Sequence, residues 1–208
     1  MAHMPTEPCG PRASIDTRTL RPGDIFFAFP GENVDGHRFV RAAIEAGASL
    51  AVVERTSLGA VDESVPREKL VIVTDTGEAL YALAKHHRDR FDPRMTAITG
   101  SNGKTTTKEL AGAVHRAAFE SLVSPGNFNN LLGLPLTLLG LNEDTERVVL
   151  EAGISVPGEM AKLAALIRPH VVVVTNVNAA HVEGLGDLRA IAREKLSLAG
   201  ALQSDGVL

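Results

Sequence analysis

The sequence has little cysteine and no long hydrophobic run. Cys9 is the only cysteine among 208 residues, so a disulfide within the chain is impossible and the composition fits a reducing compartment. The longest strongly apolar stretch, Val171–Val174, is the size of a strand and far below the ~20 residues that span a bilayer. The start carries no signal-peptide pattern. We therefore expect a cytoplasmic protein without membrane insertion.

A basic excess is also missing. The formal net charge is -4, whereas proteins that bind nucleic-acid backbones usually carry a surplus of lysine and arginine. We therefore expect no nucleic-acid partner, and any anionic ligand has to be held by local groups. The length allows one large or two small domains and can bury a sizeable core.

Three segments are expected along the chain. Prolines and glycines disfavour regular structure over residues 1–13, which we expect to be a disordered, tag-like start. Residues 14–93 combine short β-branched runs with two helical patterns, which predicts a small mixed α/β domain. Residues 94–208 alternate more regularly between strand and helix patterns, which favours a doubly wound, mostly parallel sheet.

The expected elements can be given by residue range. Strands are predicted at 25–29, 50–53, 70–73, 95–98, 121–123, 148–150 and 171–175, and helices at 39–46, 78–90, 104–119, 130–139, 158–167 and 187–203. The unbroken apolar run at 171–175 predicts a strand that is buried on both faces. The last three residues resemble the start of another strand, so we expect the sequence to be a fragment that stops inside the second domain.

The most informative segment is a glycine-containing turn between a predicted strand and a predicted helix. It reads Gly100, Ser101, Asn102, Gly103, Lys104, Thr105 and Thr106. Glycines let the backbone curl so that successive N–H groups point at phosphate oxygens, and a helix N-terminus adds partial positive charge. Lys104 can reach the β- and γ-phosphates of a nucleotide, and the Thr105 hydroxyl can bind Mg²⁺.

The turn departs from the general phosphate-binding loop (P-loop) pattern in one respect. That pattern needs a glycine five residues before Gly103, and Ile98 stands there. What remains is a shorter Gly-x-x-Gly-Lys-Thr-Thr form in the strand and helix context of a P-loop. The alternative is an ordinary glycine-rich turn with a solvated lysine.

Two further candidates follow predicted strands. Glu151 comes directly after the strand at 148–150, at the edge of a parallel sheet where ligands bind, and its carboxylate can bind Mg²⁺. The alternative is a solvated loop glutamate. His181 follows the strand at 171–175 and can ligate a metal, although Mg²⁺ prefers oxygen and a lone histidine is most often structural.

Lys195 lies on the apolar stripe of the last predicted helix, four residues after Ile191 and seven after Leu188. Burial favours the neutral amine of a lysine. A neutral amine can react with CO₂ to give a carbamate, which would supply an anionic metal ligand. The alternative is a snorkelling lysine whose stem is packed and whose head lies in water.

Together these residues resemble the Mur ligase family from about Ser14 to Leu208. The block at 99–109 is similar to the family's P-loop variant, which accounts for the missing early glycine. The segments at 126–135 and 151–153 are similar to the blocks that follow in the family. Asn176, His181 and Lys195 complete the series in the expected order. The family lysine at the position of Lys195 is typically carbamylated.

The early residues Asp16, Thr17 and Arg18 resemble the Asp-Ser-Arg element of the family's UDP-substrate domain, with a threonine in place of the serine. The resemblance implies that the domain at 14–93 binds a UDP-linked substrate through these three residues. Arg18 is the strongest candidate among them, because a guanidinium suits phosphate or carboxylate recognition.

The resemblance implies an ATP-dependent ligase of peptidoglycan precursor synthesis. The segment at 126–135 is similar to that of members that join D-alanyl-D-alanine to UDP-N-acetylmuramoyl-tripeptide. In such enzymes ATP phosphorylates the terminal carboxylate of the tripeptide, and the amine of the dipeptide attacks the acyl phosphate. The implied catalytic residues are Lys104, His181 and Lys195. The implied Mg²⁺ ligands are Thr105, Glu151, His181 and a carbamylated Lys195, with Asn129 and Asn130 close to the substrate.

Complete family members are longer, so the resemblance implies that the ATP-binding domain at 94–208 is incomplete and that a C-terminal domain is absent. We expect such a fragment to have little activity alone. Two alternatives stay open at this point. The chain could derive from another Mur ligase or a folylpolyglutamate synthase-like ligase, or it could be a non-catalytic nucleotide-binding module.

Overall fold

The computed structural model describes residues 12–31, 34–178 and 187–208. The chain forms two compact units, one ending at Ala84 and the other beginning at Lys85. The functional domain boundary at residue 93 stays a prediction. None of the helices in the described ranges is long and apolar enough to cross a membrane.

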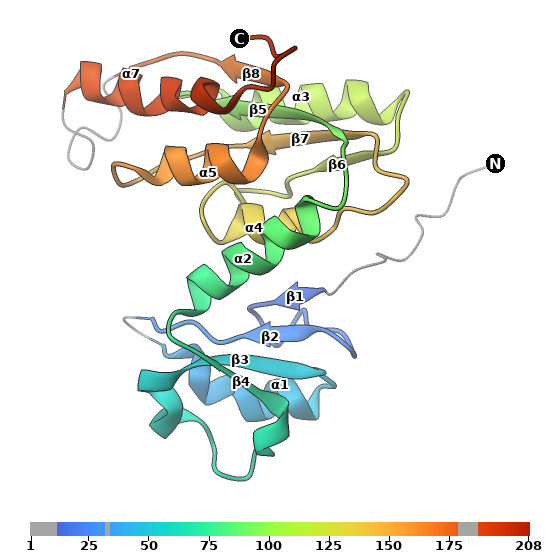
Figure 1. The fold of residues 1–208 in the computed structure, drawn as a ribbon, viewed down its shortest axis with the longest axis vertical. Helices are drawn as coiled ribbons and strands as arrows, with labels where there is room; N and C mark the ends of the chain where they lie inside the picture. The colour runs from blue at the N-terminus through green and yellow to red at the C-terminus, as the bar shows by residue number, and fades with distance from the viewer. Residues whose placement is uncertain (1–11, 32–33, 179–186) are drawn as a thin grey trace. The chain divides into compact units, whose positions relative to one another are not determined.

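The first unit is built on a four-stranded parallel sheet (Figure 1). Its strands, in spatial order, are β1 (Ala13–Ser14), β2 (Ile25–Phe27), β3 (Leu50–Glu54) and β4 (Leu70–Val73). Its helical elements are η1 (Gly36–Phe39), α1 (Val40–Glu45), η2 (Arg55–Ala60), η3 (Arg67–Lys69) and the start of α2 (Thr76–Arg88). The helix α1 packs against β3, and the core between them contains Phe26, Val40, Ala43, Ala51 and Val53.

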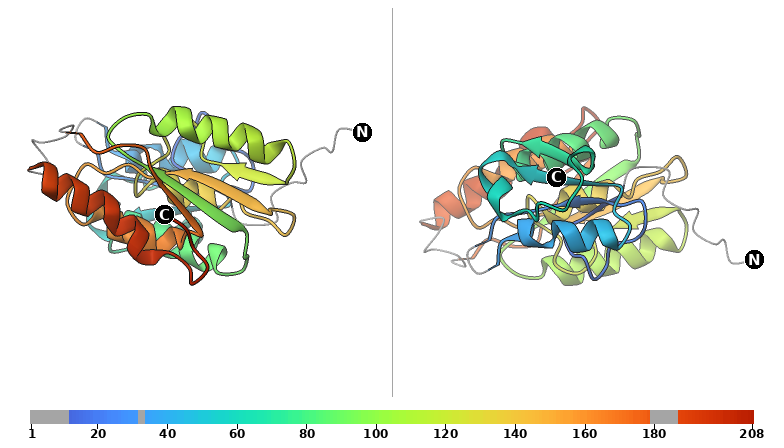
Figure 2. Two further views of the ribbon diagram at one scale, coloured as in Figure 1. Left: turned by 90° about the horizontal axis from the view of Figure 1, so that it is seen from above. Right: turned by 90° about the horizontal axis from the view of Figure 1, so that it is seen from below.

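The second unit carries a sheet of four parallel strands in the order β6, β7, β5, β8. These are β6 (Ser121–Val123), β7 (Arg147–Glu151), β5 (Arg94–Thr99) and β8 (Val171–Val174). The helix α3 (Lys104–Arg116) covers one face, and α5 (Glu159–Ile167) and α7 (Leu188–Leu196) cover the other (Figure 2). The short α4 (Gly133–Leu138) follows β6. This arrangement confirms the predicted doubly wound parallel sheet.

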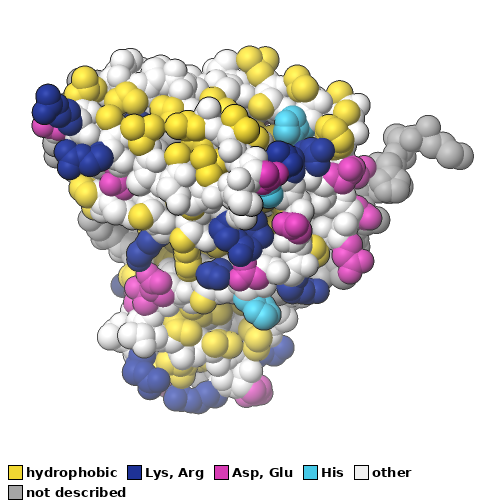
Figure 3. All heavy atoms as spheres, turned by 45° about the horizontal axis from the view of Figure 1, so that its top comes forward, with side chains coloured by type: hydrophobic (Ala, Val, Ile, Leu, Met, Phe, Trp, Pro, Cys, Tyr) yellow, Lys and Arg dark blue, Asp and Glu magenta, His cyan; other side chains and the backbone are white. Residues whose placement is uncertain are grey.

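Several predicted elements differ from the structure, and three of the differences concern β8, the last helix and α4. The strand at 171–175 was expected to be buried on both faces, but in β8 only Val172 is buried. The reason is its place at the edge of the described sheet, where only an isolated bridge to Val207 follows. Hydrophobic side chains gather over this part of the surface (Figure 3). The helix at 187–203 divides into α7 and the 3-10 helix η4 (Ser197–Ala201), and α4 starts later than predicted, at Gly133.

The strand order places the predicted site residues at one edge of the second sheet. β5 runs into the glycine turn, and β7, its neighbour, ends at Glu151, which is paired in register with Ile98. On the other side of β5, Val174 of β8 pairs with Thr99. The carboxyl ends of three adjacent parallel strands therefore surround the start of α3, which is the usual place for a ligand in such a fold.

Candidate nucleotide-binding site

The turn between β5 and α3 needs glycine at two positions. Gly100 has φ +150° and Gly103 has φ +79°, and L side chains rarely adopt these conformations. A Cβ atom on Gly100 would lie 1.9 Å from Thr175 Oγ1. The backbone of the turn therefore approaches the end of β8 more closely than any side chain at Gly100 would permit.

Lys104 begins α3 and folds back over the turn. Its Nζ donates hydrogen bonds to the carbonyl oxygens of Gly100 at 3.0 Å and Ser101 at 3.4 Å. The residue is half-buried, so its ammonium is held beside the turn. The alternative of an ordinary solvated lysine does not describe this arrangement.

Side chains of the segment after β8 form hydrogen bonds with the first half of the turn. Asn176 Oδ1 accepts hydrogen bonds from the backbone N–H groups of Ser101 at 3.1 Å and Asn102 at 2.9 Å. Thr175 Oγ1 donates to the Asn102 carbonyl at 2.6 Å. In this structure the amides of Ser101 and Asn102 are therefore already paired with a side-chain oxygen, and their contact with phosphate stays a prediction.

The amides left for an anion are those at the start of α3. Thr107 N donates to the Gly103 carbonyl, so the amides before it belong to the first turn, which has no intrahelical acceptors. Thr105 and Thr106 are exposed in this turn. Partial positive charge at the helix start adds to the attraction of an anion.

Glu151 is the last residue of β7 and is only 2% exposed. Its Oε2 accepts a hydrogen bond from Thr105 Oγ1 at 2.8 Å, and its Oε1 accepts one from Asn129 Nδ2 at 2.8 Å. Its backbone N–H donates to Ser124 Oγ at 3.1 Å. The alternative of a solvated loop glutamate is therefore wrong, because the carboxylate is buried and held at both oxygens.

The Thr105 and Glu151 oxygens fit the ligand chemistry of Mg²⁺. This ion takes oxygen ligands at about 2.0–2.1 Å in octahedral geometry and keeps several waters. Two neighbouring oxygens of such an octahedron lie roughly 3 Å apart, close to the 2.8 Å between Thr105 Oγ1 and Glu151 Oε2. Thr105 is exposed, which leaves room for water and phosphate ligands.

Lys195 is buried on α7, with 2% exposure. Its Nζ donates to the Gly100 carbonyl at 3.0 Å, the same oxygen that Lys104 contacts. Burial lowers the pKa of Lys195, and the nearby charge of Lys104 lowers the pKa further. The snorkelling alternative is wrong, since the head of this side chain is shielded from water.

The predicted second metal site cannot be placed as a whole. His181 lies outside the described residues. Within 12–31, 34–178 and 187–208, no group of three or more histidine, cysteine, aspartate or glutamate side chains could hold a metal ion. As an ammonium, Lys195 cannot ligate a cation, so a metal role for it depends on the carbamate.

Asn129 and Asn130 have separate contacts. Asn129 holds Glu151 through its side chain, and its carbonyl accepts from Gly153 N at 2.8 Å. Asn130 Oδ1 accepts from the backbone amides of Leu132 at 3.1 Å and Gly133 at 2.8 Å. The Asn130 side-chain oxygen is thus occupied by backbone amides just before and at the start of α4.

In the first unit, the predicted substrate element directly follows β1. Asp16 pairs with Arg18, whose Nε donates to both carboxylate oxygens at 2.9 and 3.0 Å. The hydrogen bonds from the Arg18 side chain and backbone lower the pKa of Asp16 to about 2. The Arg18 side chain is 86% exposed, while Thr17 is half-buried.

Sequence reasoning assigned no contact to several residues that hold this site together, although Asn176 was among those that resemble the family. Thr175 and Asn176 grip the turn, and Ser124 holds the backbone of Glu151. Lys108, on the inner face of α3, is fully buried. Its position carried little signal, because its helix neighbours at four-residue spacing, Lys104 and Gly112, do not form an apolar stripe like the one that contains Lys195.

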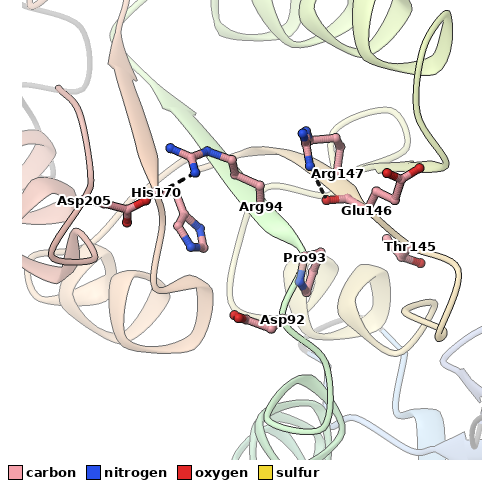
Figure 4. Close-up of a pocket in the computed structure, with 8 residues that line it drawn as sticks. All are labelled: Asp92, Pro93, Arg94, Thr145, Glu146, Arg147, His170 and Asp205. Atoms are coloured by element: carbon pink, nitrogen blue, oxygen red, sulfur yellow. Dashed lines mark hydrogen bonds and ion pairs between the residues drawn. The ribbon is translucent and has the colours of Figure 1, made fainter.

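A pocket of about 590 Å³ lies away from the predicted residues (Figure 4). Arg94 and Arg147 begin β5 and β7, and His170 directly precedes β8, so the pocket lies at the amino ends of the strands. Arg94 pairs with Asp205 at 3.2 Å across it. The pocket contains none of the turn residues and belongs to the opposite edge of the sheet.

Family models match both parts of the chain. The model of the Mur ligase middle domain matches residues 98–208, and that of the Mur ligase family catalytic domain matches residues 13–88. The second match contains all four strands of the first sheet, and the first match contains β6, β7, β8 and the end of β5. The resemblance to this family inferred from the motifs is thereby confirmed.

Individual relatives extend along nearly the whole chain. The UDP-N-acetylmuramoyl-tripeptide--D-alanyl-D-alanine ligase of Bacillus subtilis is 40% identical over 195 residues, which make up 94% of this chain and 42% of the relative. The MurF crystal structure from Acinetobacter baumannii has a TM-score of 0.83 at 33% identity and covers 94% of this chain and 42% of its own.

MurF of Thermotoga maritima, solved in complex with ADP, has a TM-score of 0.82 at 31% identity, covering 95% of this chain and 44% of its own. The chain thus spans less than half the length of the relatives that it matches.

Proposed function

The chain belongs to the Mur ligase family, and from this premise we propose that it forms the substrate-binding and nucleotide-binding part of an ATP-dependent ligase. The ligase joins D-alanyl-D-alanine to UDP-N-acetylmuramoyl-tripeptide in peptidoglycan precursor synthesis, in the cytoplasm. The site residues of the proposal are those of the turn, Glu151, His181 and Lys195, with Asp16, Thr17 and Arg18 in the first unit and Asn129 and Asn130 in the second.

The observation that carries the proposal is the arrangement at the start of α3. The amides of the first helical turn, the Lys104 ammonium and the Thr105–Glu151 oxygen pair converge on one side of the second sheet. Such a combination suits a polyphosphate with a bound cation, because each group offsets part of the phosphate charge. The ADP complex of the similar Thermotoga MurF supports a nucleotide as the ligand.

Each residue has a role in this proposal. Lys104 exchanges the carbonyls of Gly100 and Ser101 for β- and γ-phosphate oxygens, which it reaches by rotation of its stem. Thr105 and Glu151 would hold Mg²⁺ through their side-chain oxygens. When bound, this ion offsets charge on the transferred phosphoryl group. Asn129 keeps Glu151 Oε1 occupied, so that Oε2 faces Thr105.

The chemical need is activation of a carboxylate. A carboxylate is a poor electrophile, and transfer of the γ-phosphoryl group of ATP to the tripeptide carboxylate gives an acyl phosphate and ADP. The amine of D-alanyl-D-alanine then attacks the carbonyl carbon, and phosphate leaves as the amide forms. Positioning and charge neutralisation carry most of such a phosphoryl transfer.

Lys195 carries a second part of the proposal. Its burial and lowered pKa favour the neutral amine that reacts with CO₂. We propose that the resulting carbamate, with His181, completes a second Mg²⁺ site. A carbon-13 NMR experiment with labelled bicarbonate tests this, since a carbamate signal should appear in the wild type and vanish in Lys195→Arg. An unlabelled Lys195 in the wild type would rule out the carbamate.

The nucleotide part is tested by calorimetry on this chain. We expect ADP to bind more tightly with Mg²⁺ than with EDTA, and Lys104→Met to weaken binding in both conditions. No binding by the wild type would reject the proposal. Because the chain spans less than half of its relatives' length, we expect weak nucleotide binding and little ligation, and efficient ligation by this chain alone would contradict that expectation.

The substrate is tested through the choice of acceptor. In a protein of the relatives' full length that contains this chain, phosphate release should depend on D-alanyl-D-alanine together with the UDP-linked tripeptide. Release that depends on a single amino acid acceptor would favour another Mur ligase or a folylpolyglutamate synthase-like ligase. Nucleotide binding without release under any acceptor would favour a non-catalytic binding module.

A further inference from the structure

Lys108 is a charged side chain that the proposed reaction does not use. It lies on the inner face of α3 with 0% exposure. Its Nζ donates to the carbonyl oxygens of Ser124 at 2.9 Å and Gly126 at 3.0 Å, and it pairs with Glu109 Oε1 at 2.7 Å. The three N–H donors of the ammonium thus meet three acceptors.

Burial of this charge is not expected to stabilise the fold more than an apolar side chain of similar volume would. An ammonium taken out of water loses hydration, and apolar residues of similar volume often replace buried ionic groups without loss of stability. A buried cation on two loop carbonyls does, however, fix the position of that loop relative to α3. The contact therefore points to a requirement for geometry at the loop that follows β6.

That loop holds Glu151 at two places. Ser124, whose carbonyl contacts Lys108, accepts the Glu151 backbone N–H with its hydroxyl at 3.1 Å. Three residues beyond Gly126, Asn129 donates its side-chain amide to Glu151 Oε1 at 2.8 Å. A chain of hydrogen bonds therefore leads from Lys108 through the loop to the carboxylate that contacts Thr105.

The series of hydrogen bonds begins and ends on the same helix. Thr105 and Lys108 both lie on α3, so a shift of the loop relative to α3 changes the distance between the Glu151 carboxylate and the Thr105 hydroxyl. An oxygen pair that holds Mg²⁺ tolerates little change, because the ion demands near-ideal octahedral geometry. Partners of the ligands beyond the metal are often needed for affinity.

We propose that Lys108 is a positioning residue that fixes the loop after β6 and thereby sets Glu151 against Thr105 for Mg²⁺ binding. This inference rests on the proposed nucleotide function for its consequence, while its structural part stands on the hydrogen bonds alone. Lys108 touches neither nucleotide nor substrate in this account.

The structural part is tested by NMR-detected hydrogen exchange without ligand. In Lys108→Met the amides of Glu151 and Gly153, which bind Ser124 Oγ and the Asn129 carbonyl, should exchange about 10-fold faster because their acceptors lie on the released loop. Exchange in the middle of α3 should stay unchanged. Wild-type exchange at Glu151 and Gly153 in this variant would overturn the inference.

The functional part is tested by ADP binding with Mg²⁺ and with EDTA. Lys108→Met should keep the EDTA affinity within about 2-fold and reduce the gain from Mg²⁺ about 10-fold, the range seen when partners of metal ligands are removed. Ser124→Ala removes the hydrogen bond between the loop and the Glu151 backbone and should give the same loss of the Mg²⁺ gain. This second variant keeps the test possible if Lys108→Met folds poorly. An unchanged Mg²⁺ gain in both variants would overturn the inference.

Arg88→Met is the matched control. Arg88 is 3% exposed and donates to the carbonyls of Phe91 at 3.3 Å and Ile167 at 3.2 Å, so it is also a buried cation on carbonyl oxygens. Arg88→Met should leave the gain in ADP affinity from Mg²⁺ intact. If this gain fell equally in Arg88→Met and Lys108→Met, Lys108 would have only a general structural role and the inference would be overturned. If wild-type ADP binding is absent altogether, the proposed function fails, and hydrogen exchange alone decides the inference.

Discussion

Replacement of Gly100 by alanine should disturb the turn far more than replacement of Gly103. Both residues have a positive φ, which costs an L residue about 1–2 kcal/mol. A new Cβ on Gly103 would have its nearest neighbour at 3.9 Å, whereas one on Gly100 would lie 1.9 Å from Thr175 Oγ1. The overlap adds about 1–3 kcal/mol, so we expect losses of roughly 1–2 kcal/mol for Gly103→Ala and 2–5 kcal/mol for Gly100→Ala.

Urea unfolding of the two variants measures this difference, provided that the slope of the transition is unchanged. Removal of the Thr175 hydroxyl gives a sharper test. In Gly100→Ala/Thr175→Ala the 1.9 Å overlap is gone, and the next contacts lie at 3.2 Å. The double variant should be more stable than the sum of the single losses predicts, by about 1–3 kcal/mol. Equal losses for both glycines, or additive losses in the double variant, would refute this geometry.

Three further predictions concern single side chains. Lys104→Met should weaken ADP binding about 10–100-fold in calorimetry, the worth of a charge-assisted hydrogen bond. Glu151→Gln keeps the volume of the buried side chain but lacks the anionic oxygen, so it should abolish the gain in ADP affinity from Mg²⁺ and leave binding in EDTA unchanged. In a carboxyl NMR titration Asp16 should titrate at about 2, and Arg18→Ala should move its pKa towards 3.8. The stabilisation from this pair is complete above pH 3.8 and is lost as the pH falls towards 2, so a wild-type midpoint near 3.8 would contradict it.

Much of the fold could be predicted from periodicity. The short segments that became β4 and β6 were predicted at the observed residues, since a short run with apolar residues between polar segments has few alternatives. β1 was missed because two residues show no alternation. Burial of β8 was overestimated because the sequence does not reveal which strand lies at the edge of the described sheet.

The candidate site was only partly predictable. The turn and Glu151 could be found because their chemistry follows directly from position after a strand. The grip of Asn176 on the turn joins residues that lie more than seventy positions apart, and a single sequence carries no signal for such a contact. Lys108 was not singled out, because its helix neighbours at four-residue spacing are a lysine and a glycine, and its acceptors lie in a loop whose path the sequence does not define.

The proposed nucleotide site depends most on the pairing of Thr105 and Glu151. Crystals of this chain grown with ADP and Mn²⁺, which replaces Mg²⁺ and gives an anomalous signal, test it most directly. We expect phosphate oxygens at the first amides of α3 and an anomalous peak in contact with Thr105 Oγ1 and Glu151 Oε2. A nucleotide bound elsewhere, or a metal peak away from both oxygens, would contradict it.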